Sequence, residues 1–340
     1  MSDKKILTVS ASPHIKSPST VTGIMLDVII ALIPAAFAGV AVFGIRAAIV
    51  IAVCVISCVL FEYISRRVLK RSSSIGDLSA VVTGLLLAFN LPVGIPLWMC
   101  VVGSFVAIVI VKQMFGGIGH NFANPAITAR IVMLVSFTSA MTKFTQPLSN
   151  SLDAVTSATP LAHLTAIDLS GDITAQMNAG FESGDIPGIL NMLFGIRSGC
   201  IGEVCSVAIV FGAIYLILRG IISIKIPLSY LLTVAIFMFI ASDFNVMFTV
   251  YEILGGGLLL GAFFMATDYS TSPINNKGKI VFGIGCGILT AVIRLYGSLP
   301  EGVSYSILLM NIATPLIEKA TAPKFFGFIP QKKKKEAADK

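Results

Sequence analysis

The chain has 340 residues, of which 56% are hydrophobic and only 12% are charged, with a formal net charge of +7. A soluble domain keeps about a quarter of its residues charged because its surface faces water, so this composition excludes a soluble globular protein. The run of four lysines at 332–335 has no interleaved aromatic residues. We therefore expect no nucleic-acid partner, and interpret the run as a topology anchor or a contact with anionic lipid.

Hydrophobic residues occur in long runs and do not alternate with polar ones, a pattern typical of membrane-spanning helices and not of a water-filled barrel. The sequence predicts an all-α polytopic membrane protein with about ten transmembrane helices. The first run is too long for the core of a cleavable signal, so we expect it to stay in the mature chain. The predicted spans lie near residues 21–43, 46–66, 78–91, 95–112, 124–141, 203–219, 226–242, 248–267, 280–297 and 302–318.

Two of these predicted spans are irregular. The third, 78–91, is short and ends at Asn90-Leu-Pro92, and the eighth, 248–267, contains Gly255-Gly-Gly257. Interrupted segments of this kind often line a binding site in membrane proteins. Glycine also permits close helix packing, and the pattern alone does not separate the two interpretations.

The distribution of Lys and Arg predicts the topology. With ten spans both chain ends share one side, and nineteen of the 24 basic residues fall on that side. The positive-inside rule then places both ends in the cytoplasm of a prokaryote, with a multi-pass body in the cell membrane. The other basic residues are Arg46, Lys143, Arg197 and Arg294 on the opposite side and Arg130 inside a span.

This topology divides the chain into five predicted parts. Two five-helix membrane halves flank an extracytoplasmic segment, and the short ends are cytoplasmic. The parts are a cytoplasmic segment 1–20, a first membrane half 21–141, an extracytoplasmic segment 142–202, a second membrane half 203–319 and a basic cytoplasmic tail 320–340.

Two short sequence similarities recur in the same order in both halves. Five is an odd number, so a five-plus-five duplication inserts the second half upside down. Inverted repeats of this kind place a site near the midplane, between the halves. The matched segments are Asn121-Phe-Ala-Asn-Pro-Ala-Ile127 with Asn311-Ile-Ala-Thr-Pro-Leu-Ile317, and Gly84-Leu-Leu-Leu-Ala-Phe89 with Gly257-Leu-Leu-Leu-Gly-Ala262.

The segment 142–202 is far longer than the usual connection between helices. It contains Asp153-Ala-Val-Thr-Ser-Ala-Thr159-Pro-Leu161. By composition alone, this stretch is typical of an ordinary solvated turn or a helix cap. It also resembles Asp-x-x-(Ser/Thr)-Gly-Ala-(Thr/Ser), the motif of proteins that carry FMN on a threonine through a phosphoester bond.

That resemblance implies a role for each residue of the motif. Thr159 would be the acceptor of the covalent FMN, and a flavin transferase outside the cytoplasmic membrane would install it. Asp153 and Thr156 would belong to the recognition sequence, and Ala158 would leave room for the phosphate. Ser157 stands where the motif more often has glycine.

Further segments resemble signature segments of one family, NqrB/RnfD, which contains the D subunit of the Rnf complex and its sister, the B subunit of the Na⁺-translocating NADH:quinone reductase. The resemblance runs from about residue 12 to residue 321. About twenty residues precede the first span, and this short extension favours the Rnf member. The segments are Asp77-Leu-Ser-Ala-Val-Val-Thr-Gly-Leu-Leu-Leu87, Gly116-Gly-Ile-Gly-His-Asn-Phe-Ala-Asn-Pro-Ala126, Gly199-Cys-Ile-Gly-Glu203 and Phe263-Phe-Met-Ala-Thr-Asp-Tyr-Ser-Thr-Ser-Pro273.

Membership of this family would imply a fold similar to urea transporters, with two inverted five-helix halves. It would also imply covalent FMN and a second, non-covalent flavin, riboflavin. The parent complex is an oxidoreductase that moves electrons between ferredoxin and NAD⁺ while translocating Na⁺ or H⁺. Its other membrane and peripheral subunits, including a second flavin-threonine subunit and iron–sulfur subunits, would be the partners, and this chain alone would not be catalytic.

Polar residues within or beside the predicted spans are further candidates for a flavin or ion site, because such groups are costly in lipid. Asn121, Asn124 and Thr128 are expected to bond a flavin ring edge or to satisfy a broken helix. Arg130 is expected to pair with a carboxylate or with a flavin. Asp268, followed by a run of hydroxyl residues, is expected to line a polar site.

Other ionisable residues support weaker interpretations. Glu62 is expected in an interfacial charge cluster with Arg66 and Arg67, and Asp27 at a membrane edge or beside a cation. The six cysteines and three histidines are too scattered for a metal site within this chain. The competing function is a standalone solute channel or transporter, which would have no need of the threonine motif.

Overall fold

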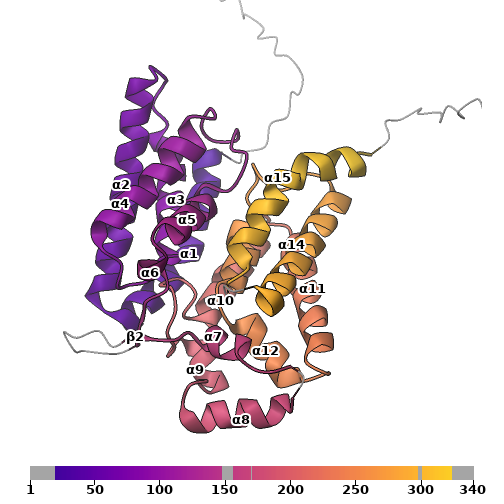
Figure 1. Ribbon diagram of the computed structural model, residues 1–340. Coiled ribbons are helices and arrows are strands. Elements are labelled where there is room, and N and C mark those ends of the chain that lie inside the picture. Colours follow the sequence, from indigo (N-terminus) through magenta and orange to yellow (C-terminus); the bar gives the residue numbers. More distant parts are fainter. Residues whose placement is uncertain (1–19, 148–155, 170, 298–300, 324–340) are drawn as a thin grey trace, which may run out of the picture.

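The computed structural model describes residues 20–147, 156–169, 171–297 and 301–323. Two helical bundles lie side by side, and a cap of short helices closes one end (Figure 1). The first bundle contains α1 to α5 and the second α10 to α15. The C-terminal end of α15 lies at the end of the molecule away from the cap.

The first bundle is built from long apolar helices and one short one. Its helix α1 begins after Thr20, whose side chain accepts a hydrogen bond from Gly23 N and so caps the helix. The helix α3 ends before the Asn90-Leu-Pro92 sequence, because proline cannot continue a helix. The elements are α1 (Val21–Phe43), α2 (Ile45–Val68), η1 (Ile75–Asp77), α3 (Ser79–Phe89), α4 (Leu97–Phe105), η2 (Val106–Gln113), α5 (Pro125–Ser136) and α6 (Thr138–Met141).

The second bundle contains a broken helix where the sequence has three glycines. The helix α12 ends at Leu254, and Gly256 has a φ of +62°, a left-handed conformation that favours glycine. The following segment turns away by 64°. The elements are α10 (Ser206–Leu218), α11 (Lys225–Ala241), α12 (Val246–Leu254), α13 (Leu258–Leu260), η3 (Gly261–Met265), α14 (Asn276–Tyr296) and α15 (Val303–Thr321).

The cap comes from the predicted extracytoplasmic segment. It begins with a short antiparallel pair, β1 (Phe144–Thr145) and β2 (Thr156–Ser157), and continues in three short helices. These helices are α7 (Pro160–Thr165), α8 (Ile173–Ser183) and α9 (Ile189–Phe194).

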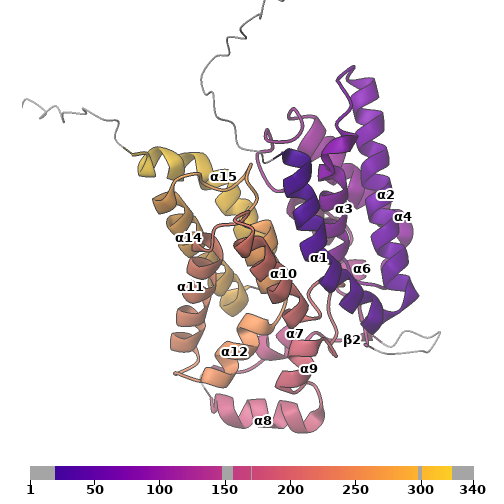
Figure 2. The ribbon, with the colours of Figure 1, turned by 180° about the vertical axis from the view of Figure 1, so that it is seen from behind.

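The bundles meet through α1 against α10 and through α5 against α15. Figure 2 shows α1 and α10 as neighbours from the back of the molecule. A Cβ atom at Gly212 of α10 would overlap the carbonyl oxygen of Ala31 on α1. The small residue therefore lets the two backbones approach closely, as glycine does at many membrane helix interfaces.

Helix length and hydropathy support a membrane protein but not the full count of spans. Within the described residues, α1, α2 and α14 are each long and apolar enough to cross a membrane, and the bent pair α12 with 258–265 makes a fourth candidate. Five further apolar helical segments have 10–17 residues. The all-helical membrane class is confirmed, whereas ten spans and the inverted repeat stay predictions.

Candidate functional site

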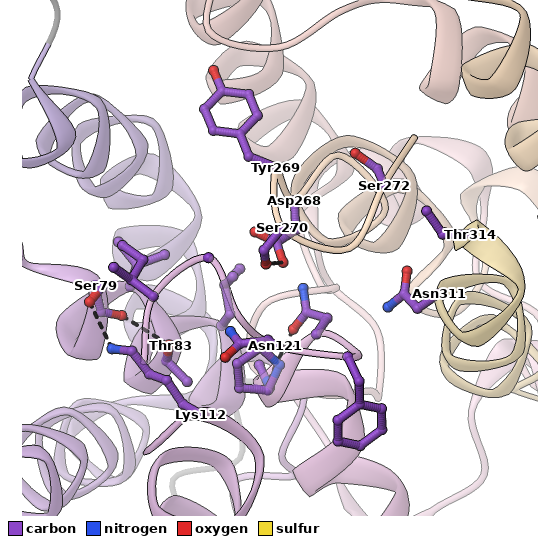
Figure 3. Close-up of a pocket in the computed structure, with 18 of the residues that line it drawn as sticks. Ser79, Thr83, Lys112, Asn121, Asp268, Tyr269, Ser270, Ser272, Asn311 and Thr314 are labelled. Carbon is purple, nitrogen blue, oxygen red and sulfur yellow. Dashed lines mark hydrogen bonds between the residues drawn. The ribbon is translucent and has the colours of Figure 1, made fainter. Parts of the chain in front are cut away.

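A cavity of about 640 Å³, which we call the inner cavity, lies between the bundles. Its wall comes from α1, α3 and η2 of the first bundle, the loop before α5, the loop after η3, and α15. Figure 3 shows polar side chains from both bundles around it, among them Asn121, Asp268 and Asn311. A volume of this size falls within the range of small-molecule and cofactor sites.

The two Asn/Pro segments matched in the sequence both line the inner cavity. Asn121, Asn124 and Pro125 face it from the first bundle, and Asn311 and Thr314 face it from α15. The similarity predicted a site between the halves, and the fold brings both segments to one cavity. The duplication itself stays a prediction.

Asn124 connects the bundles and starts α5. Its Oδ1 accepts hydrogen bonds from Ala126 N at 3.0 Å and Ile127 N at 3.3 Å, which caps the helix. Its Nδ2 donates to Met265 O of the second bundle at 3.2 Å. All of these contacts stay within the protein, so Asn124 acts first as a structural bridge.

Asn121 differs from Asn124 because its carbonyl oxygen has no partner. Oδ1 of Asn121 is buried and makes no hydrogen bond in the described structure. A buried acceptor left unpaired is costly, and a water or a ligand that donates a hydrogen bond would satisfy such an atom.

Asp268 lies in the cavity wall contributed by the loop after η3. One carboxylate oxygen, Oδ2, accepts hydrogen bonds from Ser270 Oγ at 2.8 Å and Thr271 Oγ1 at 3.1 Å. Burial raises the pKa of the Asp268 carboxyl, and these two hydroxyl bonds partly oppose the rise. The hydroxyl residues expected beside Asp268 therefore contact it directly.

Lys112 was not among the predicted site residues, yet it also lines the inner cavity. Its Nζ forms an ion pair with Glu62 at 2.7 Å and donates to Ser79 Oγ at 2.7 Å. Glu62 is fully buried and accepts a further hydrogen bond from Ser74. The expectation that Glu62 sits in an interfacial cluster with the arginines of its own helix is wrong, because its carboxylate turns inward to Lys112.

Thr128 and Arg130 do not line the inner cavity. The Thr128 hydroxyl donates to Asn124 O, one turn earlier, at 2.9 Å. Arg130 donates to Asn90 Oδ1 at 2.7 Å and forms an ion pair with Glu301. Of the five polar residues predicted around the inner site, the fold therefore brings Asn121, Asn124 and Asp268 together.

A second buried cluster surrounds Arg130. One ligand atom each from Cys200, Glu203 and Glu301 lies within 4.8 Å of the other two. The Arg130 guanidinium pairs with Glu301 in this cluster and opposes binding of a cation there. Asp27, expected at a membrane edge or beside a cation, pairs with the Arg219 guanidinium at 3.0 Å and accepts a hydrogen bond from the Tyr215 hydroxyl at 2.7 Å.

The threonine motif lies in the cap. Thr159 is 6% exposed and precedes α7, where its Oγ1 accepts a hydrogen bond from Ala162 N at 3.2 Å. Ala158 is exposed. The backbones of Thr156 and Ser157 form β2, and Asp153 lies outside the described residues.

A hollow of about 490 Å³, which we call the outer hollow, lies beside Thr159. Both neighbours of Thr159 in the sequence, Ala158 and Pro160, contribute to its wall. The cap therefore offers a polar recess, with an arginine in its wall, next to the predicted acceptor. The polar residues of this wall are Gln146, His163, Asp185, Arg197 and Ser198.

Buried arginines brace the broken helix beneath the cap. Arg197 donates to Leu254 O at 2.6 Å, and Arg294 donates to Gly255 O at 3.2 Å and to the Glu252 carboxylate at 2.9 Å. These bonds satisfy carbonyls at the end of α12 that no helical N–H reaches. Both arginines were expected outside the membrane, and both are buried at the junction of cap and bundle.

Comparison with known proteins identifies the family. A profile described as the NQR2, RnfD, RnfE family matches residues 8–327. The D subunit of the Na⁺-translocating ferredoxin:NAD⁺ oxidoreductase complex of Acetobacterium woodii is 48% identical over 97% of this chain and 98% of that protein. The D subunit of the proton-translocating ferredoxin:NAD⁺ oxidoreductase complex of Clostridium ljungdahlii is 43% identical over 95% of this chain and 97% of that protein.

A more distant relative gives the same result. The D subunit of the ion-translocating oxidoreductase complex of Stutzerimonas stutzeri is 36% identical over 91% of this chain and 93% of that protein. These matches extend across both bundles and the cap and confirm the predicted family. The chain belongs to the NQR2, RnfD, RnfE family.

Proposed function

We propose that this chain is a membrane electron-carrier subunit of an ion-translocating ferredoxin:NAD⁺ oxidoreductase, with FMN attached covalently to Thr159. Its similarity to the D subunits of two such complexes, along nearly the whole chain, carries this proposal. The redox reaction belongs to the assembled complex, with its other membrane subunits, its iron–sulfur subunits and a second flavin-threonine subunit. This chain alone is not catalytic.

The residues around Thr159 fit a phosphoester. The Thr159 oxygen acts as an acceptor toward Ala162 N, a bond that an ester oxygen can also accept. The outer hollow gives space on the side of Ala158, and the side chains of Gln146 and His163 in its wall offer N–H donors for a phosphate. Bound FMN would supply the electron-transfer chemistry. The residues of this chain would hold the flavin in position and set the charges around it.

The inner cavity is the second part of the proposal, as a site for a non-covalent flavin such as riboflavin. The unpaired Asn121 Oδ1 fits the ring N–H of a flavin, which is a hydrogen-bond donor. Asp268 and its hydroxyl neighbours supply further polar groups. Asn124 holds the two bundles together around this space.

The topology belongs to the same proposal. We place ten spans in two inverted halves, both chain ends in the cytoplasm, and the cap outside the cell membrane, where a flavin transferase has access to Thr159. Two observations support this arrangement. The matched Asn/Pro segments meet at one cavity, and the cap lies at the opposite end of the molecule from the end of α15 (Figure 1).

In-gel ultraviolet fluorescence of the denatured chain tests the covalent flavin. The chain is co-expressed with a flavin transferase as wild type, as Thr159→Ala and as Thr165→Ala, which removes an exposed hydroxyl at the end of the same helix. We expect fluorescence in the wild type and in Thr165→Ala, and none in Thr159→Ala.

Two other outcomes would change the proposal in different ways. A dark wild-type band would favour the alternative of a solute channel, for which the cavity between two halves would be the pore. Equal fluorescence in wild type and Thr159→Ala would leave the carrier role and reject Thr159 as the attachment site.

A further inference from the structure

Lys112 is the only Lys or Arg among the described residues that line the inner cavity. It lies in η2, a π-helical continuation of α4, and π-helical turns are frequent at functional sites. Its side chain is 3% exposed, so its charge is held in the wall and not in solvent. In Figure 3 it reaches toward Ser79, close to Thr83.

The partners of Lys112 hold the ammonium in place from behind. Glu62 and Ser79 accept two of its three N–H groups, and the third remains for another acceptor. Lys112 and Ser79 line the cavity and Glu62 does not, so the positive member of the buried pair is the one in the cavity wall. Ser74 fixes the far carboxylate oxygen of Glu62 at 2.5 Å.

The opposite wall of the inner cavity carries the opposite charge. Asp268 and Glu318, both from the second bundle, line this wall, and Asn121 Oδ1 of the first bundle adds an unpaired acceptor. A ligand that fits this arrangement donates a hydrogen bond at one edge and presents acceptors, or negative charge, to Lys112. The flavin ring system has both, because its ring N–H stands beside carbonyl oxygens and an acceptor ring nitrogen.

We propose that Lys112 binds the acceptor edge of the flavin in the inner cavity and stabilises its reduced form, with Glu62, Ser74 and Ser79 as positioning residues. This inference rests on the proposed flavin site. Two electrons and one proton convert a neutral oxidised flavin ring into a reduced ring with one negative charge. A fixed ammonium beside that charge favours the reduced state and raises the potential of the flavin.

Riboflavin binding to the full-length chain tests the role of Lys112. The chain is purified in lipid nanodiscs in a Thr159→Ala background, so that covalent FMN does not interfere. The dissociation constants of oxidised and of dithionite-reduced riboflavin are measured for each variant. Removing Lys112 alone would leave a buried carboxylate unpaired, so the main variant is the double substitution Lys112→Met/Glu62→Gln.

We expect the double variant to bind oxidised riboflavin within about threefold of the background and reduced riboflavin at least tenfold more weakly. A tenfold loss of affinity for reduced relative to oxidised riboflavin lowers the two-electron potential of the bound flavin by about 30 mV. Lys112→Arg should keep most of the preference for the reduced form. Lys277→Met, which removes an exposed charge on α14 outside the cavity wall, should leave the ratio unchanged.

The outcomes separate this inference from the flavin site itself. If riboflavin binds no variant, the background included, the flavin site and the role of Lys112 both fail. If riboflavin binds and the ratio of its two dissociation constants is the same in the double variant as in the background, the flavin site stands. Lys112 is then only a structural tie between η2 and α2. If Lys277→Met changed the ratio of dissociation constants as much as the double variant does, the specific role of Lys112 would also be rejected.

Discussion

The outer hollow and the inner cavity would hold flavins in opposite ways. In the cap, one side chain and its sequence motif identify the attachment point, and a covalent bond needs few surrounding contacts. Between the bundles, no single motif identifies the site, because its wall comes from helices that are far apart in the sequence. A local motif is therefore enough to propose a covalent site, whereas a site assembled by packing needs the fold.

The cap is nevertheless packed against the membrane body at the broken helix. Leu161, two residues after Thr159, packs toward Gly255 and Gly256 at the broken helix. Arg294 and Glu252 brace that same break with an ion pair in which both side chains are almost fully buried. The position of the outer hollow thus depends on a polar junction within the membrane body.

Breaking this junction should have the largest effect on the free energy of unfolding. Arg294→Met leaves the Glu252 carboxylate buried without its partner, and such a change costs about 3 kcal/mol or more of the free energy of unfolding. The double variant Arg294→Met/Glu252→Gln removes both charges and should recover at least half of that loss. Unfolding by SDS titration from mixed micelles measures both values, and equal losses in the two variants would show that the pair is not the brace.

The pairs of buried charges also show where the sequence was insufficient. Long apolar runs predicted an all-helical membrane fold, and the family resemblance was confirmed at near full length. Neither pattern could assign Lys112 to Glu62 or Arg294 to Glu252, because each pair joins residues more than forty positions apart. Only the packed fold decides whether a basic residue near the end of a span faces solvent or a buried carboxylate.

Asn121 and Asn124 permit a sharper test of the inner cavity, because they are the same residue type in one segment. Asn121→Leu removes an unpaired acceptor, so it should leave the stability nearly unchanged and weaken binding of the non-covalent flavin by about tenfold or more. Asn124→Leu removes a helix cap and a bond between the bundles, and should cost about 2 kcal/mol of the free energy of unfolding.

Two measurements on the purified chain separate these variants. Acid precipitation releases the non-covalent flavin for quantification, and SDS titration gives the stability. If Asn121→Leu retains all of its acid-released flavin, the unpaired oxygen is not a ligand contact. The in-gel fluorescence of the covalent flavin should be the same in both variants, since neither residue contacts the cap.

The repeated Asn/Pro segments show how sequence and packing combine in this site. Their similarity predicted a shared location without saying which side chains would face it. Asn121 and Asn311 occupy equivalent positions in the two segments, and so do Asn124 and Thr314; all four line the inner cavity. Pro125 starts α5 and Pro315 lies inside α15, and proline leaves a helical carbonyl without an N–H donor, which explains why polar side chains occur beside both.

Substitution of Thr128 should have the smallest effect on stability and flavin binding, although the sequence placed this residue among the flavin-binding candidates. Its hydroxyl donates to the carbonyl of Asn124 within its own helix and does not reach the inner cavity. Thr128→Val keeps the shape of the side chain and removes only this local bond, so the free energy of unfolding should change by no more than about 0.5 kcal/mol. Non-covalent flavin should stay within twofold of wild type in the acid-release assay. A larger loss of flavin at unchanged stability would mean that the hydroxyl turns to the ligand when the cavity is filled, and the boundary of the inner site would then include this turn of α5.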